Sequence, residues 1–410
     1  MSNTPNIRFK GFTDSWEQRK LSEIGVKVTD KNKNNLFDEP FTNSAEKGII
    51  SQKEYFDREV VNENNLDYYY VVQSDDFVYN PRVSVTAPVG PINRNKLGRN
   101  GVMSPLYTVF RTHDIDKLYL EYFFKTTGWH RFMKLNGDSG ARFDRFTISS
   151  AQFMEMPIPY PCNMEQQKIG QFFDALDTLI TLHQRKCDEI SELKKFMLQK
   201  MFPKNGEQFP EIRFGEFTAP WEQRKVTELG EIYIGLVTTM TSHYTNQGSL
   251  LIRNSDIKDS RFEFGDNPIY LDEEFATQNA SRKHKVGDVI TVHTGDIGTS
   301  AVITEKEVDS IGFATIVTRP FKDKITSEYL CTFLNTDVHK NFAIGISTGD
   351  GRNNYNLKDY YECVVPVPKL EEQKKISEYI QNMNDLITLN QRKCDDLKAV
   401  KKFMLQNMFP

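Results

Sequence analysis

Residues 165–203, EQQKIGQFFDALDTLITLHQRKCDEISELKKFMLQKMFP, are repeated at residues 372–410 as EQKKISEYIQNMNDLITLNQRKCDDLKAVKKFMLQNMFP. About half of the aligned positions are identical and no gap is needed, so that Cys187 corresponds to Cys394 at an offset of 207 residues, which is 394 − 187. The repeat predicts that the protein arose by a tandem duplication.

Both copies carry apolar residues at alternating steps of four and three, the spacing of a heptad seam on a long helix. A helix of roughly 38 residues is a rod of about 55 Å with one apolar side, and such a rod needs a partner in water. We therefore expect the two helices to pair along their seams. The expected seam residues are Ile169, Phe173, Leu176, Ile180, His183, Cys187 and Ile190 in the first copy, and Ile376, Ile380, Met383, Ile387, Asn390, Cys394 and Leu397 in the second.

Two polar features of these helices have structural meaning. Asn163 and Gln166 have the spacing of a capping box at the start of the first helix, and the second copy lacks this signal. His183 and Asn390 place a polar residue at the same point of both seams, a pattern that fixes the register of paired helices while lowering their stability.

A second repeat precedes each globular part of the chain. Residues 6–25, NIRFKGFTDSWEQRKLSEIG, return at residues 211–230 as EIRFGEFTAPWEQRKVTELG, and we call each copy an IRF segment. We interpret the IRF segment as a packing element in which Trp16 and Trp221 anchor the start of each body, in preference to direct ligand contact. Each half of the chain is then an IRF segment, a body and a long helix.

The expected fold class is α+β, with two globular α/β bodies separated by a pair of long antiparallel coiled-coil helices in a tandem pseudo-two-fold duplication. Both bodies contain strand-like and helix-like segments and end in a glycine-rich basic loop followed by a P-x-P segment, but otherwise they align only loosely. The expected boundaries are 1–162 for the first IRF segment and body, 163–203 for the first helix, 204–368 for the linker, second IRF segment and second body, and 369–410 for the second helix.

Catalytic and metal-binding signatures are missing from the sequence. It contains no G-x-x-x-x-G-K-[ST] and no G-x-G-x-x-G after a strand. Asn80 and Pro81 resemble the start of the NPP motif of adenine methyltransferases, but Arg82 follows where that motif needs proline. The five cysteines and seven histidines do not have metal-ligand spacing. We therefore expect no catalytic residue, no metal site and no cofactor bound by this chain.

The chain shows no signal peptide and no apolar run of membrane-spanning length, so we expect a cytoplasmic protein. Its net charge of −4 gives no global indication of nucleic-acid binding. Any such site must therefore be local.

Residues 77–113 form the strongest local candidate, because they contain five arginine or lysine residues and no acidic residue. Arginine and asparagine are the side chains that read guanine and adenine edges in the major groove. A solvated basic loop is the alternative interpretation. The candidate DNA-contacting residues of the first body are Arg82, Ser84, Thr86, Asn93, Arg94, Lys96, Arg99, Arg142 and Arg145. Those of the second body are Arg253, Asn254, Arg282, Lys283, His284, Thr294, Arg352, Asn353 and Asn354.

Over essentially its whole length the chain resembles the specificity subunits of type I restriction-modification systems. The resemblance rests on the two IRF segments, the P-x-P segments followed by EQ-x-KI at Glu165 and Glu372, the QRKCD and KKFMLQ-x-MF helices, and the two divergent bodies. It implies that each body is a target recognition domain reading one half of a bipartite DNA sequence, and that the helices form an antiparallel spacer.

The resemblance also implies partners: double-stranded DNA, two methyltransferase (modification) subunits and endonuclease-translocase (restriction) subunits. S-adenosylmethionine, ATP and Mg would be bound by those partners, and adenines in the target would be methylated. Two other functions remain open. A stand-alone DNA-binding regulator would bind its site tightly without partners, and a single-chain nuclease or methyltransferase would need a carboxylate or cofactor motif.

Overall fold

The computed structural model describes residues 4–55, 66–138, 144–204, 206–347 and 354–410. The chain divides into two compact units: unit 1 comprises Met1–Gln184 and Arg392–Pro410, and unit 2 comprises Arg185–Gln391. Each unit thus combines one body with a segment of both long helices. No helix in the described ranges is long and apolar enough to cross a membrane.

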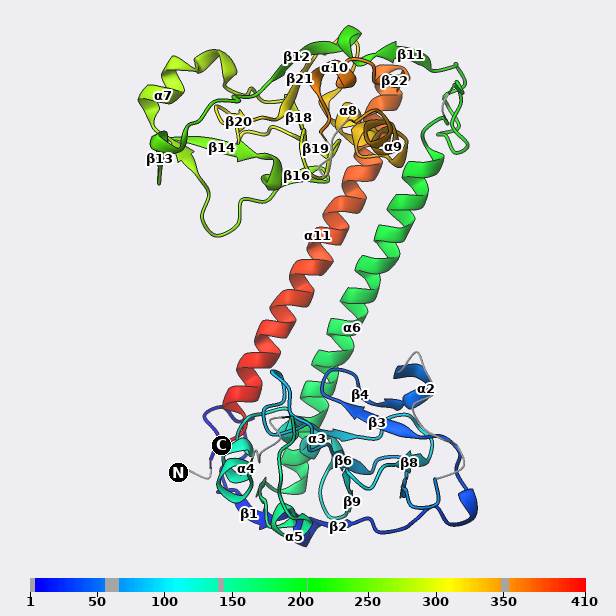
Figure 1. The fold of residues 1–410 in the computed structure, drawn as a ribbon, viewed down its shortest axis with the longest axis vertical. Helices are drawn as coiled ribbons and strands as arrows, with labels where there is room; N and C mark the ends of the chain where they lie inside the picture. Colours follow the sequence, from blue (N-terminus) through cyan, green and yellow to red (C-terminus); the bar gives the residue numbers. More distant parts are fainter. Residues whose placement is uncertain (1–3, 56–65, 139–143, 205, 348–353) are drawn as a thin grey trace. The chain divides into compact units, whose positions relative to one another are not determined.

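Unit 1 is built around a four-stranded antiparallel sheet with the strand order β2-β9-β6-β7 (Figure 1). Strand β1, which lies in the first IRF segment, pairs separately with β10, the strand formed by the P-x-P segment at the end of the body. The strands are β1 (Glu17–Lys20), β2 (Gly25–Lys27), β3 (Phe41–Ser44), β4 (Gly48–Ser51), β5 (Tyr70–Val72), β6 (Phe77–Tyr79), β7 (Ile92–Arg94), β8 (Gly101–Met103), β9 (Thr108–Thr112) and β10 (Pro157–Tyr160). The helices of the body are α1 (Leu21–Ile24), α2 (Gln52–Tyr55), α3 (Lys117–Phe124), α4 (His130–Asn136) and α5 (Ser150–Met154).

Unit 2 contains a corresponding sheet with the order β12-β21-β18-β19, and strand β11 of its IRF segment pairs with β22, the strand of its P-x-P segment. The strands are β11 (Glu222–Lys225), β12 (Gly230–Ile234), β13 (Tyr244–Thr245), β14 (Ser249–Arg253), β15 (Ile257–Lys258), β16 (Arg261–Phe262), β17 (Tyr270–Leu271), β18 (Val289–Thr291), β19 (Ser300–Val302), β20 (Ile311–Phe313), β21 (Ile316–Pro320) and β22 (Val364–Val367). The helices of the body are α7 (Glu273–Gln278), α8 (Ser327–Leu334), α9 (Asp337–Ile346) and α10 (Leu357–Tyr360).

The duplication extends through the bodies, although their sequences align only loosely. The sheets β2-β9-β6-β7 and β12-β21-β18-β19 have corresponding strand orders, and a buried aspartate precedes the same strand in each. Unit 2 also has a further four-stranded sheet, β13-β17-β14-β20, in which β14 and β20 are parallel. Arg111 donates to both carboxylate oxygens of Asp76 at 2.7 and 2.8 Å, and Arg319 donates to both of Asp288 at 2.8 Å. Bidentate pairs of this kind fix geometry as well as charge. The sheet was therefore retained while the loops diverged.

The long helices α6 (Asn163–Lys200) and α11 (Leu370–Asn407) pair within each unit, as the seams predict. In unit 1 the Cys394 thiol lies 3.9 Å from the Ile180 carbonyl, and Lys401 forms an ion pair with Asp177, which makes the helices antiparallel. In unit 2 the Cys187 thiol lies 3.6 Å from the carbonyl of Ile387. Every predicted seam residue is buried or half-buried. The heptad interpretation is confirmed.

The carboxyl end of each long helix is an aromatic anchor for the unit that it reaches. Phe409, after α11, packs in unit 1 against Tyr119 and Phe173 with ring centroids 5.4 and 6.0 Å apart. Phe202, after α6, packs in unit 2 against Tyr329 and Trp221 at 5.7 and 6.1 Å. Aromatic burial of this kind contributes both area and preferred ring geometry.

A buried ion pair in each unit ties the IRF segment to the first turn of a long helix. Arg8 donates two hydrogen bonds to Glu165 at 2.6 and 2.8 Å, and Trp16 Nε1 donates to the same carboxylate at 3.1 Å. Arg213 repeats the bidentate contact with Glu372 at 2.7 and 2.8 Å. Both tryptophans are buried, which confirms that the IRF segment is a packing element. Trp221 Nε1 has no hydrogen-bond partner among the described residues.

The predicted capping box between Asn163 and Gln166 is wrong. The Gln166 amide instead accepts from the backbone N–H of Asp116 and donates to the carbonyl of Pro161, both at 2.8 Å. Gln373 makes the equivalent pair of contacts with Thr326 and Pro368 at 2.9 Å. A buried amide must satisfy both its donor and its acceptor. Each glutamine does so by bonding to the body with its oxygen and to the P-x-P segment with its nitrogen.

Replacing Glu165 by alanine should destabilise unit 1 by about 3 to 5 kcal/mol, because Arg8 is left largely buried without its counter-charge. Glu372→Ala should lower the free energy of unfolding of unit 2 by about 1 kcal/mol less than Glu165→Ala lowers that of unit 1. The reason is that Glu165 also accepts a hydrogen bond from a tryptophan, whereas Glu372 does not. Hydrogen exchange by mass spectrometry on peptides covering β1 and β11 measures each unit separately. Glu17→Ala, at an exposed carboxylate, is the control, and equal loss of protection in Glu17→Ala and Glu165→Ala would contradict this account.

Candidate nucleic-acid interface

In unit 1, the loop after β6 is joined to the segment that follows the glycine-rich stretch. The backbone N–H of Phe146 donates to the carbonyl of Pro81 at 2.7 Å, and the N–H of Val83 donates to the carbonyl of Asp144 at 3.1 Å. Arg82 and Arg145 form a β-bridge between the two segments. Two cations of the predicted interface, far apart in sequence, are thereby placed side by side, with Arg82 exposed and Arg145 partly exposed.

The same loop continues into a tight turn at residues 84–87, which we call the fingertip. The N–H of Ser84 donates to the carbonyl of Ala87 at 3.1 Å, and the N–H of Ala87 donates back at 3.2 Å. Ser84, Val85 and Thr86 project into solvent, whereas Ala87 is buried. The fingertip therefore presents two hydroxyl groups and one apolar side chain on a fixed backbone.

Unit 2 joins the corresponding segments in the same way. The N–H of Tyr355 donates to the carbonyl of His293 at 2.8 Å, in the loop after β18, and Thr294 forms a β-bridge with Asn354. The side chains of Thr294 and Asn354 are 3.0 Å apart. Both units thus connect the loop after the central strand to the far end of the glycine-rich segment, but they present different side chains there.

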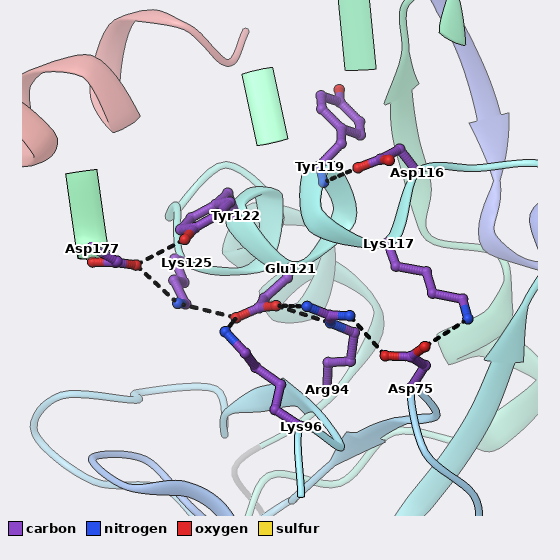
Figure 2. Close-up of polar contacts among 10 residues, drawn as sticks. All are labelled: Asp75, Arg94, Lys96, Asp116, Lys117, Tyr119, Glu121, Tyr122, Lys125 and Asp177. Atoms are coloured by element: carbon purple, nitrogen blue, oxygen red, sulfur yellow. Dashed lines mark hydrogen bonds and ion pairs between the residues drawn. The ribbon is translucent and has the colours of Figure 1, made fainter. Parts of the chain in front are cut away.

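Arg94 belongs to an internal ion-pair network rather than to this surface, and Lys96 contacts the same network but stays about half exposed (Figure 2). Arg94 contacts Glu121 at 2.8 Å and Asp75 at 2.7 Å, and Lys96 lies 3.3 Å from Glu121. Burial alone would raise the pKa of Glu121, but Lys125, Arg94 and Lys96 outweigh it and hold that pKa below its usual value. The network stabilises the body, so we leave Arg94 out of the interface.

The network continues from the body to the paired helices of unit 1. Lys125, at the carboxyl end of α3, lies 3.3 Å from Glu121 and 3.9 Å from Asp177 on α6. Asp177 also accepts from the Tyr122 hydroxyl at 2.8 Å and pairs with Lys401 of α11. Arg94 and Lys96 of residues 77–113 are thus linked to the helix carboxylate Asp177 only through Glu121 and Lys125.

Asn93 and Arg99 also have internal partners. Asn93 donates to Asn43 at 2.7 Å, and Arg99 donates to both oxygens of Glu39 at 2.8 Å. Arg99 remains about half exposed and can exchange a surface carboxylate for a phosphate, whereas the Asn93 amide is used within the body. The sequence suggested that both side chains were available to DNA, whereas the structure shows both bonded within the body.

The second-body candidates divide in the same way. His284 is completely buried, and we remove it from the interface. The Asn254 amide is bonded to the His293 N–H and to the carbonyl of Ala314, so it holds the loop after β18 in place. Arg253 is paired with Asp256, and Arg282 donates to the carbonyl of Ile234.

Lys283 is half-buried beside β20, with which it forms a β-bridge at Ile311. Arg142, Arg352 and Asn353 lie outside the described residues. Within the described ranges, no group of three or more histidine, cysteine, aspartate or glutamate residues could hold a metal ion.

Sequence reasoning missed the residues that shape the two loop junctions. Asp144 and His293 act through backbone carbonyls, and any residue type supplies such a carbonyl, so no sequence signal identifies them. Val85 is not among the residues that the sequence suggests, because those candidates are all basic or polar. Its exposure follows from the turn at residues 84–87, which composition alone does not reveal.

Two bodies with the same sheet, each with a pair of joined surface loops and each packed on two paired helices, define a duplicated α+β protein. A family model described as the type I restriction modification DNA specificity domain matches residues 13–192 and 219–399. The chain belongs to this family and is a specificity subunit of a type I restriction-modification system.

Relatives and solved structures agree with this assignment. The chain is 22% identical over 316 residues to the type I restriction enzyme MjaVIII specificity subunit of Methanocaldococcus jannaschii, covering 75% of this chain and 73% of that relative. Its fold is similar to the HsdS subunit from Thermoanaerobacter tengcongensis, with a TM-score of 0.50, 15% identity and coverage of 100% and 99%. The type I S subunit from M. genitalium gives a TM-score of 0.55 at 12% identity, with 99% of each chain covered.

Two buried histidines predict a pH dependence of the stability of unit 2. Burial lowers the pKa of His284 to about 4 and that of His339 to about 4. An unfolded histidine binds its proton below about pH 6.5, so stability is complete above that pH and falls as the pH decreases toward the folded value. Each histidine should remove about 2 kcal/mol of unfolding free energy between about pH 7 and pH 5.

Urea unfolding at those two pH values measures this loss. His339→Gln should flatten the pH dependence, although it lowers stability at neutral pH by removing the contacts with Leu334 and Tyr355. His113→Gln, at an exposed position of unit 1, should leave the dependence unchanged. A His339→Gln profile parallel to that of the unaltered protein would contradict the assignment.

Proposed function

We propose that this chain reads a bipartite DNA target, with one half-site bound by each body, and that it performs no catalytic step itself. The observation that carries the proposal is the recurrence of the joined loop pair in both units, on the same sheet but with different side chains: Arg82 and Arg145 in unit 1, and Thr294 and Asn354 in unit 2. Recognition of two different half-sites requires different base-contacting side chains, and the two units present such side chains on the same backbone arrangement.

The remaining candidates on these surfaces are consistent with this role. Arg82 and Lys283 can contact phosphates, and Ser84, Thr86, Thr294 and Asn354 can donate to or accept from base edges. Arg145 is joined to Arg82 and can contact phosphates beside it, whereas Arg99, Lys96, Arg253 and Arg282 are partly committed to internal partners and would act at the margin of the interface. Arg142, Arg352 and Asn353 stay predictions, because they lie in the glycine-rich segments whose flanks form the junctions.

The catalytic partners that we infer are two methyltransferase subunits and the endonuclease-translocase subunits of the restriction complex. S-adenosylmethionine would be bound by the former and ATP with Mg by the latter, so that adenines in the target are methylated or unmodified DNA is restricted in the cytoplasm. Methylation inside a duplex requires extrusion of the base. We therefore expect tight DNA binding only in the assembled complex, unlike a stand-alone regulator.

Exposed apolar side chains on the long helices support docking of the same partner twice. Four positions on the helix segments of unit 1 recur in unit 2 at the offset of 207 residues, and their exposed fractions range from 42% to 56%. We call these positions the helix stripe. They are Leu179, Leu182, Val400 and Phe403 in unit 1, and Leu386, Leu389, Leu193 and Phe196 in unit 2. Repeated exposed apolar groups indicate a protein contact rather than isolated surface residues.

The helices also supply a spacer. The 38 residues of α6 correspond to about 57 Å at 1.5 Å per residue, which is longer than one turn of DNA at about 34–36 Å. Because α6 contributes residues to both units, its length would set the gap between the half-sites.

The proposed function is tested by adenine-methylation sequencing of cells with and without this chain, together with co-purification. Deleting the chain should abolish methylation at one split adenine motif, and the purified complex should contain two methyltransferase chains per specificity chain. An unchanged methylome, or tight site-specific binding by the chain alone, would contradict the proposal and favour a stand-alone regulator.

Charge placed on the helix stripe should remove one partner at a time. Leu179→Glu with Leu182→Glu, and separately Leu386→Glu with Leu389→Glu, should each lower the number of bound methyltransferase chains from about two to one, because burying an unpaired carboxylate costs several kcal/mol. Native mass spectrometry of the complex measures the stoichiometry. Thr181→Glu, at an exposed position outside the stripe, is the control. Full occupancy in both double variants would show that the stripe is not the docking surface.

A further inference from the structure

The fingertip of unit 1 carries an apolar side chain that is completely exposed. The relative exposure of Val85 is 101%, the highest value among the large hydrophobic residues that the structure describes as exposed. Its neighbours on the fingertip, Ser84 and Thr86, are polar and exposed. The same loop carries Arg82, which is bridged to Arg145. The apolar group thus lies within the part of unit 1 that offers hydrogen bonds and positive charge.

Both legs of the loop are fixed to the core, so the fingertip is held in place before any ligand binds. On one leg, Val83 is hydrogen-bonded to Asp144. On the other, the buried Tyr79 hydroxyl donates to the carbonyl of Val89 at 2.9 Å. Gly90 has a φ of +84°, and a Cβ there would lie 2.1 Å from the Asn80 carbonyl, so only glycine allows this close return. A preorganised tip loses less conformational entropy on binding than a flexible one.

The corresponding loop of unit 2 is built differently. Its apolar residue, Ile297, is buried, and the residues near its junction, Thr294 and Asn354, are polar. Gly298 packs against His339 at this place, where a Cβ would lie 3.1 Å from the imidazole. An exposed apolar tip is therefore a property of the loop of unit 1 and not of the duplicated frame.

We propose that Val85 is a specificity-determining residue that contacts the C5-methyl group of a thymine in the half-site read by unit 1. This inference rests on the proposed function, because it requires that the fingertip enters the major groove. The thymine methyl is the apolar group that base pairs present there, and aliphatic side chains recognise it by contact. Ser84 and Thr86 flank the methyl contact with hydroxyl groups that bond to adjacent base edges or phosphates.

The test uses the assembled methyltransferase complex and the target defined by methylation sequencing. Each thymine of the target is replaced in turn by uracil, which lacks the methyl group, and the rate of adenine methylation is measured with the unaltered chain and with Val85→Ala. Val26→Ala is the matched control, because Val26 is also an exposed valine of unit 1 but lies on β2, away from the fingertip.

With the unaltered chain, uracil at one position of one half-site should lower kcat/KM about three- to tenfold, the effect of losing one buried methyl contact. Val85→Ala should lose a similar factor on thymine-containing DNA and lose nothing further on the uracil substrate, because both changes remove the same contact. Val26→Ala should behave as the unaltered chain.

Three results would overturn the inference: no uracil position affects the rate, Val85→Ala methylates normally, or the losses from uracil and from Val85→Ala multiply. The last result would arise if Val85 acted as a wedge between bases, independently of any methyl group. Failure of the proposed function is distinguishable, because the unaltered complex would then methylate no split motif.

Discussion

A carboxylate in the first turn of each long helix holds each unit together. Glu165 and Glu372 are almost completely buried, and each accepts two hydrogen bonds from an IRF-segment arginine about 160 residues earlier in the chain. The neighbouring glutamines, Gln166 and Gln373, connect the same helical turn to the body and to its P-x-P segment. The IRF segment, the body and the helix therefore meet at one pair of side chains, and a buried ion pair is stable only where such geometry is complete.

The two units share this junction and the sheet, and they differ in the surface loops. The Arg111 and Asp76 pair and its counterpart, Arg319 and Asp288, keep the sheet in place in both units. The loops after β6 and β18 are joined to the segments that follow the glycine-rich stretches by backbone hydrogen bonds, which do not depend on the side chains at the junction. Such attachment allows the reading residues to diverge without loss of the fold, which suits a protein that determines sequence specificity.

The sequence allowed prediction of the elements whose signals are local or repeated. The heptad seam from Ile169 to Ile190 and the burial of Trp16 and Trp221 follow from spacing and repetition, and the structure confirms them. Charge composition was a weaker guide. Arg94 and His284 looked available in sequence, but the carboxylate of Glu121 comes from α3, and the burial of His284 depends on strands distant in the chain. The junction of Arg82 with Arg145 was beyond prediction for the same reason, because it depends on backbone pairing between remote loops.

The most direct test of the central claim, that two independent readers share one duplicated frame, is an exchange of one body. Residues 21–161 are replaced by the corresponding body of another specificity subunit with a different target, and the methylome of cells carrying the hybrid is sequenced. The account predicts a split motif in which one half is new, while the other half and the gap are unchanged. A hybrid that folds and methylates but alters both halves would contradict it.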